Sequence, residues 1–80
     1  MRVTYSLQVC ATCPVDNLAD LYDVEITSSE VITVEAILDA VETINKKDFQ
    51  ENITVALARE LPALVKTTGW HSGVKTVCEA

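Results

Sequence analysis

The chain has 80 residues, of which 49% are hydrophobic and 22% charged, and its formal net charge is −6. This length fits one domain over residues 1–80 with a small core, and chains of this size often gain burial by oligomerisation. The hydrophobic share excludes a disordered chain, no stretch is apolar enough to span a membrane, and the acidic balance disfavours attraction to phosphate backbones at long range.

The first part of the chain predicts two antiparallel strands joined by a loop. Apolar and polar residues alternate from Arg2 to Thr12, which is the pattern of a half-buried strand. Pro14 to Asp20 contain the Pro, Asp and Asn residues that favour turns and predict a loop. Alternation resumes from Tyr22 to Thr27 and predicts the second strand.

The middle of the chain predicts a first helix after a turn at residues 28–30. Thr33 has the chemistry of a helix N-cap, and Ile32 and Ile37 have the spacing of a hydrophobic staple around it. Lys46 and Lys47 suit the helix C-terminus, where the backbone dipole favours positive charge. The apolar residues that recur at helical spacing are Val34, Ile37, Leu38, Val41 and Ile44.

A second helix is predicted to begin at Asp48 and to end near Pro62. Asp48 and Glu51 have the spacing of a capping box. The expected buried stripe consists of Phe49, Ile53, Ala56, Leu57 and Leu61.

Two β-rich runs follow, residues 64–68 and 74–78, and predict a hairpin around Gly69 to Gly73. The element order is then strand, strand, helix, helix, strand, strand. Such blocks favour an α+β fold with a four-stranded antiparallel sheet and both helices on one face. The alternative is a helix that runs past Pro62, followed by a single C-terminal strand. Trp70 in this hairpin is expected to be a packing residue or an interface anchor.

The three cysteines, Cys10, Cys13 and Cys78, are an odd number, which argues against a closed disulfide framework. The N-terminal residues have no apolar stretch typical of a secretory signal, so we expect a cytoplasmic protein with free thiols. A zinc site needs four ligands, and beyond Cys10-x-x-Cys13 only Cys78 and His71 remain. If the first strand continues through Cys13, the Cys10 and Cys13 thiols face opposite sides of it, so we expect no metal.

Cys13, Asp20 and Glu51 carry a resemblance to a known family. The stretch Cys13-Pro14-Val15 with Asp20 seven residues after the cysteine resembles the nucleophile loop of the 7-cyano-7-deazaguanine reductases, the tunnelling-fold nitrile reductases of the queuosine pathway. Phe49-Gln50-Glu51 stands where that family has Phe-His-Glu, and residues 69–74 stand where it has a glycine-rich hairpin. The resemblance spans roughly Cys10 to Val77.

The resemblance implies a tunnelling fold, in which subunits close into an oligomeric barrel, and a role for each matched residue. A nitrile carbon is a poor electrophile, so a thiolate must attack it, and Cys13 would form a covalent thioimide. Asp20 would be the general acid that protonates the nitrile nitrogen. Glu51 would bind the ring N–H and the amine of a 7-deazaguanine together. Gln50 and His71 are further candidates for substrate binding.

Each of these residues also has a simpler interpretation. Cys13 has the apolar parity of its strand and fits a small buried residue. Asp20 fits a turn residue, Glu51 fits the partner of Asp48 in the capping box, and His71 fits a surface residue of the hairpin. The joint occurrence of Cys13, Asp20 and Glu51 favours the functional interpretation.

Two departures from the family shape the functional expectation. Gln50 replaces the family histidine, and the lysine-rich motif that binds NADPH phosphates is absent, since residues 34–42 contain three acids and no base. The chain thus looks like the archaeal amidinotransferases, relatives that add ammonia to the thioimide and use no cofactor. The alternatives are an NADPH-dependent reductase and a non-catalytic binding or interaction module. The substrate would be a free 7-deazapurine or one held in tRNA or another nucleic acid.

Overall fold

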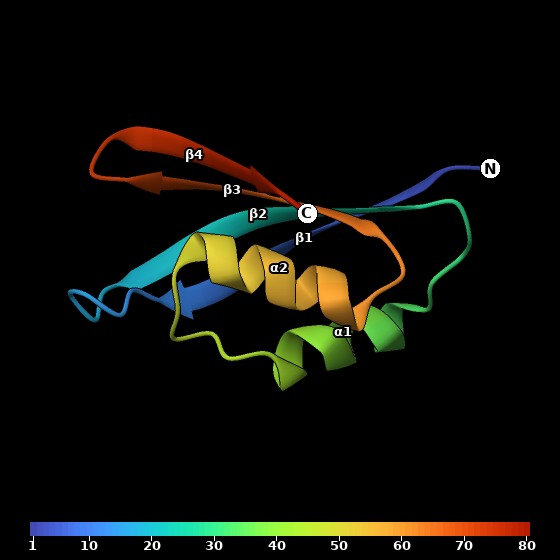
Figure 1. Cartoon of the computed structure of the whole chain (residues 1–80), viewed down its shortest axis with the longest axis horizontal. Helices are drawn as coiled ribbons and strands as arrows, with labels where there is room; N and C mark the ends of the chain where they lie inside the picture. The colour runs from blue at the N-terminus through green and yellow to red at the C-terminus, as the bar shows by residue number, and fades with distance from the viewer.

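The computed structural model describes all 80 residues. The elements in chain order are β1 (Val3–Thr12), β2 (Ala19–Ser28), α1 (Val34–Thr43), α2 (Gln50–Glu60), β3 (Leu64–His71) and β4 (Val74–Glu79). The strands form one antiparallel sheet in the order β1-β2-β3-β4, and both helices lie on the same face of it (Figure 1). The predicted α+β fold and element order are confirmed. The alternative helix past Pro62 is wrong, because Leu64 already begins β3.

The hydrophobic core lies between the helices and the sheet. Alternate residues of β2, namely Tyr22, Val24 and Ile26, face the helices, while the residues between them face solvent, as the period of two in a strand requires. The core cluster of 13 buried residues consists of Val9, Ala11, Tyr22, Val24, Ile26, Ile32, Ile37, Ala40, Ile44, Ile53, Leu57, Leu61 and Val65. Neither helix has the length and apolar character needed to cross a membrane.

Two strands are longer than the sequence predicts. Asp20 was expected in the loop but belongs to β2, where it pairs with Ala11. The strand β3 continues to His71, so only Ser72 and Gly73 form the turn, with φ angles of 50° and 82°. Positive φ at both central residues matches the twist of a two-residue hairpin, and glycine adopts it without steric cost. This tight turn places His71 at the very end of β3.

The start of α1 follows the prediction. The Thr33 hydroxyl accepts a hydrogen bond from the Ala36 backbone N–H at 3.1 Å, and Ile32 and Ile37 are both buried. At the other end, Lys46 Nζ donates to the Val41 carbonyl at 2.7 Å. The predicted apolar stripe is partly wrong, because Val34 and Leu38 are exposed. Only some of the apolar residues of α1 therefore contact the core, and the buried stripe of this helix is narrower than the sequence predicts.

The start of α2 differs from the prediction. The helix begins at Gln50, the N-cap is Phe49, and no side chain caps it. Asp48 Oδ1 instead accepts from the Phe49 backbone N–H at 2.7 Å and from the Asn52 side chain at 2.9 Å, while the Glu51 carboxylate makes no hydrogen bond. The predicted capping box is therefore wrong. Phe49 is also half exposed rather than part of the buried stripe, because an N-cap residue stands off the helix surface.

The opposite face of the sheet has no helix over it (Figure 1). Its side chains are mostly polar, and Trp70 in β3 is 65% exposed there. The prediction that Trp70 packs within its own chain is therefore wrong. A role for Trp70 in an interface, like the homo-oligomer itself, stays a prediction.

Candidate functional site

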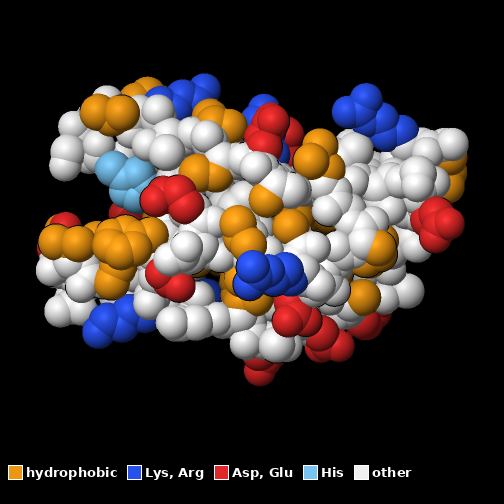
Figure 2. Space-filling model, in the orientation of Figure 1, with side chains coloured by type: hydrophobic (Ala, Val, Ile, Leu, Met, Phe, Trp, Pro, Cys, Tyr) orange, Lys and Arg blue, Asp and Glu red, His pale blue; other side chains and the backbone are white.

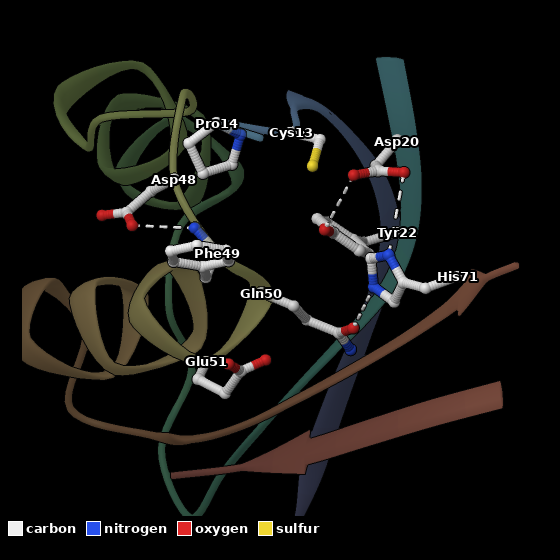
Figure 3. Close-up of a pocket in the computed structure, with 9 residues that line it drawn as sticks. All are labelled: Cys13, Pro14, Asp20, Tyr22, Asp48, Phe49, Gln50, Glu51 and His71. Atoms are coloured by element: carbon white, nitrogen blue, oxygen red, sulfur yellow. Dashed lines mark hydrogen bonds and ion pairs between the residues drawn. The ribbon is translucent and has the colours of Figure 1, made fainter. Parts of the chain in front are cut away.

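Three connections of the fold meet at one end of the sheet: the β1–β2 loop, the start of α2 and the β3–β4 turn (Figure 1). Together they enclose a cavity of about 200 Å³. It is lined by Cys13, Pro14, Asp20, Tyr22, Asp48, Phe49, Gln50, Glu51 and His71 (Figure 3). All five residues that the sequence singled out are among these, although they lie as far apart in the chain as Cys13 and His71.

A short backbone link holds the β1–β2 loop against the start of α2. The Thr12 N–H donates to the Lys46 carbonyl at 2.9 Å, and Thr12 pairs with Lys47 as an isolated parallel bridge. The end of β1 is thereby fixed beside the segment that leads into α2. The residues that follow each side of this link, Cys13 and Phe49–Glu51, must then face the same space.

The loop that carries Cys13 is closed by its own hydrogen bonds. The Cys13 N–H donates to the Leu18 carbonyl and the Asn17 N–H to the Cys13 carbonyl, both at 2.9 Å. The thiol is partly exposed and points into the cavity (Figure 3), so the interpretation of Cys13 as a buried core residue does not hold. The Leu18 N–H and the Cys13 thiol both donate to Asp16, and these bonds hold the pKa of that carboxyl below its usual range.

Asp20 faces the cavity from β2 and lies between two partners. The Tyr22 hydroxyl donates to Asp20 Oδ2 at 3.4 Å, and His71 Nδ1 lies 3.9 Å from Asp20 Oδ1. Burial, followed by the nearby Asp20 charge, raises the pKa of Tyr22 to about 12. The phenol therefore remains protonated at neutral pH and acts as a donor to Asp20.

Gln50 forms the floor of the cavity and is 2% exposed. Its Nε2 donates to the Thr67 carbonyl at 3.2 Å, to Thr67 Oγ1 at 3.1 Å and to the Thr76 carbonyl at 3.0 Å. Its Oε1 lies 2.9 Å from His71 Nε2. The residue thus ties α2 to β3 and β4. Whether Gln50 also contacts a substrate stays a prediction.

Glu51 and Phe49 form the opposite wall. The Glu51 carboxylate lies across the opening from the Cys13 thiol, and the Phe49 ring lines the cavity to one side of them (Figure 3). Glu51 belongs to the first turn of α2, where backbone N–H groups favour a negative charge. Since the carboxylate makes no hydrogen bond within the chain, both of its oxygens are available to a ligand.

Gly69 allows the close packing behind the cavity. A Cβ atom at this position would lie 2.5 Å from Tyr22 Cδ1 and 3.4 Å from Gln50 Oε1. Any larger residue would displace the tyrosine ring and crowd the glutamine. Position 69 must therefore be glycine, because the side chains of Tyr22 and Gln50 approach its backbone too closely for a Cβ atom.

The sequence did not single out Tyr22, Pro14, Asp48 or Phe49 as lining residues. Tyr22 follows Asp20 by two residues in one strand, so both point to the same face of the sheet. That parity was the available signal, but it was missed because Asp20 was expected in the loop. Phe49 was expected in the core. Figure 2 shows His71, the only histidine, at the left end of the molecule above a group of hydrophobic side chains.

Comparison with known proteins finds similar structures but no match by sequence. No model of a known protein family matches the chain, and no curated protein matches it. A crystal structure described as the archaeosine synthase QueF-Like in the apo form matches with a TM-score of 0.86 and 17% sequence identity. The match covers 99% of this chain and 90% of that chain. The expected tunnelling fold is therefore confirmed: this chain has the fold of the QueF-Like archaeosine synthase along its whole length.

Proposed function

We propose that this chain processes 7-cyano-7-deazaguanine: Cys13 forms a thioimide with the nitrile, and ammonia converts the thioimide to an amidine. The observation that carries the proposal is the meeting of a thiol, a hydrogen-bonded carboxyl and an unpaired carboxylate in one cavity, from three separate elements. The similar fold of an archaeosine synthase supports the 7-deazaguanine class of ligand.

The first half of the reaction needs a nucleophile and an acid. The Cys13 sulfur bonds to the nitrile carbon as its S–H bond breaks, and the thiol proton passes to solvent at the open side of the cavity. The nitrile nitrogen takes one proton from Asp20. One S–H bond has then been added across the C≡N bond, and the thioimide is neutral.

The second half needs only an amine. Ammonia bonds to the thioimide carbon, the C–S bond breaks, and the sulfur leaves with its electron pair. The added nitrogen loses one proton and the sulfur takes one up, which restores the Cys13 thiol. The product is the amidine, and no electrons enter or leave. A reductase would need a dinucleotide instead, whose phosphates require positive charge. Glu35, Asp39 and Glu42 of α1 carry the wrong sign for that contact.

Recognition of the base falls to Glu51 and Phe49. The two free oxygens of Glu51 can accept hydrogen bonds from a ring N–H and an adjacent amine, which is the donor pair that a deazaguanine presents. The half-exposed Phe49 ring offers a flat apolar surface beside it. A cavity of about 200 Å³ is smaller than the roughly 300–1,000 Å³ of typical ligand pockets, so it suits a compact heterocycle.

The proposal is tested by product analysis after incubation with 7-cyano-7-deazaguanine and either ammonium or NADPH. We expect an amidine product with ammonium and no consumption of NADPH. Cys13→Ala should give no product, whereas Cys10→Ala, which removes an exposed thiol outside the cavity, should be fully active. Consumption of NADPH with an aminomethyl product would support the reductase instead. A tRNA carrying the nitrile base, tested in parallel, separates a nucleic-acid substrate from the free base.

A further inference from the structure

The orientation of the Gln50 amide is fixed by its surroundings. Two of the three groups that Nε2 contacts, the Thr67 and Thr76 carbonyls, can only accept hydrogen bonds. A flipped amide would place its oxygen against both carbonyls, in a site that is almost fully buried. Nε2 therefore faces the sheet, and Oε1 faces the cavity as an acceptor.

The acceptor on Gln50 determines the protonation of His71. Because Oε1 has only lone pairs to offer, the His71 nitrogen that lies 2.9 Å away, Nε2, must carry a hydrogen. A neutral imidazole carries one hydrogen, so Nδ1 then has a free lone pair. Nδ1 is the nitrogen that faces Asp20 Oδ1. The second oxygen of Asp20 is already held by the Tyr22 hydroxyl.

We propose that Gln50 is a positioning residue that holds His71 as the Nε2–H tautomer, so that His71 Nδ1 exchanges one mobile proton with Asp20. Before the reaction the mobile proton lies on Nδ1 of the His71 imidazolium; it passes to the Asp20 carboxylate and from Asp20 to the nitrile nitrogen, which leaves His71 as the neutral Nε2–H imidazole and Asp20 as a carboxylate. The proton count is unchanged apart from the one that reaches the ligand. The relay step rests on the proposed function, whereas the tautomer of His71 does not.

The geometry suits a relay more than a static ion pair. The 3.9 Å between Nδ1 and Oδ1 exceeds hydrogen-bond length, and catalytic hydrogen bonds are often long before a ligand binds. Gln50 fixes the other side of the ring and leaves a small closing movement to Asp20 and His71. The other titratable groups that line the cavity are Cys13, Tyr22, Asp48 and Glu51, and none of them has an ion pair or hydrogen bond with His71.

The first test uses nitrogen-15 NMR of the free protein. His71 is the only histidine, so a single imidazole appears in the spectrum. We expect the neutral ring to carry its hydrogen on Nε2, with exchange against water slow enough for that hydrogen to be observed. Gln50→Met should make the exchange fast, while Gln8→Met, a matched change at an exposed glutamine, should not. A wild-type ring with its hydrogen on Nδ1 would overturn the inference, and this measurement needs no variant to fold.

The second test uses the rate at which the Cys13 adduct forms with 7-cyano-7-deazaguanine. His71→Asn and Gln50→Met should slow the rate by up to about 10²-fold, the lower end of a general-acid contribution, without changing the final extent. Equal rates in both variants and wild type would overturn the relay while leaving the proposed function intact. Absence of any adduct in wild type would overturn the proposed function, and the tautomer measurement would still decide the role of Gln50.

Discussion

The two helices begin in opposite ways. The start of α1 obeys local rules: the Thr33 hydroxyl caps it by accepting from the Ala36 N–H, and Ile32 and Ile37 on either side of the cap are buried. The start of α2 has an aromatic N-cap with no side-chain bond, a buried glutamine and an unpaired glutamate. Local rules are commonly broken where residues serve a function. The contrast separates the end of the molecule that stabilises the fold from the end that forms the cavity.

The largest expected effect is on ligand affinity, and it comes from comparing substitutions of the glutamates in the first turns of α1 and α2. Glu51→Gln replaces one free acceptor with a donor that faces the ligand's own donors, so it should weaken binding of 7-cyano-7-deazaguanine by about 10- to 100-fold, as expected for a hydrogen bond to a charged group. Glu35→Gln makes the same change at the start of α1 and should leave affinity unchanged. Calorimetric titration with both variants measures the difference. Equal affinities would assign Glu51 to the helix dipole alone.

Thr33→Ala should destabilise the protein by about 1 kcal/mol, because it removes a side-chain cap. For a domain of this size that corresponds to a melting temperature lower by about 4–8 °C. Asp48→Ala should cost less, because the Asp48 carboxylate lies before the N-cap of α2 and bonds only the adjacent Phe49 N–H and an exposed side chain. Thermal melts of both variants test the contrast, and a larger loss in Asp48→Ala would contradict it.

A cap can also be added to α2. Phe49→Ser and Phe49→Ala both remove the ring, but serine can accept a hydrogen bond from the first turn and alanine cannot. The serine variant should therefore be more stable than the alanine variant by about 1 kcal/mol. Both should bind the base more weakly than wild type, since both lack the flat surface. Unchanged affinity in both would exclude Phe49 from the recognition of the ligand.

The smallest expected effect on stability at neutral pH comes from substitution of Tyr22. Its pKa is raised from 10.0 to about 12 in the folded protein, so the unfolded chain loses this proton first as the pH increases. The stability that this group contributes is complete below pH 10 and is lost as the pH rises from 10 to 12. Tyr22→Phe should remove this part of the alkaline loss, while Tyr5→Phe, in β1 and outside the cavity, should retain it. Melting curves across that pH range measure both.

The same contrast explains what the sequence could predict. Thr33, Ile32 and Ile37 were assigned correctly because capping and stapling are local rules, with signals a few residues apart. The start of α2 was assigned wrongly because Asp48 and Glu51 satisfy the spacing of a capping box that the chain does not form. The Asn52 side-chain amide donates to the Asp48 carboxylate instead, and no distinct sequence pattern marks this bond.

For the site, the sequence could predict which residues take part but not how they come together in space. Cys13, Asp20 and Glu51 could be selected because their chemistry is complementary and their spacing resembles a family. Their meeting in space depends on long-range links, such as Thr12 to Lys46 and Gln50 to the Thr76 carbonyl, which no local pattern reveals. The role of Gln50 was hidden for the same reason, because a glutamine at the start of a helix normally faces water.

We propose Cys13 as a nucleophile towards a nitrile base that is held at the start of α2. Intact-protein mass spectrometry after incubation with 7-cyano-7-deazaguanine, without ammonium, tests it most directly. We expect a mass increase equal to one ligand, retained in Cys10→Ala and Cys78→Ala and abolished in Cys13→Ala. An unmodified wild-type protein, or an adduct that persists in Cys13→Ala, would contradict it.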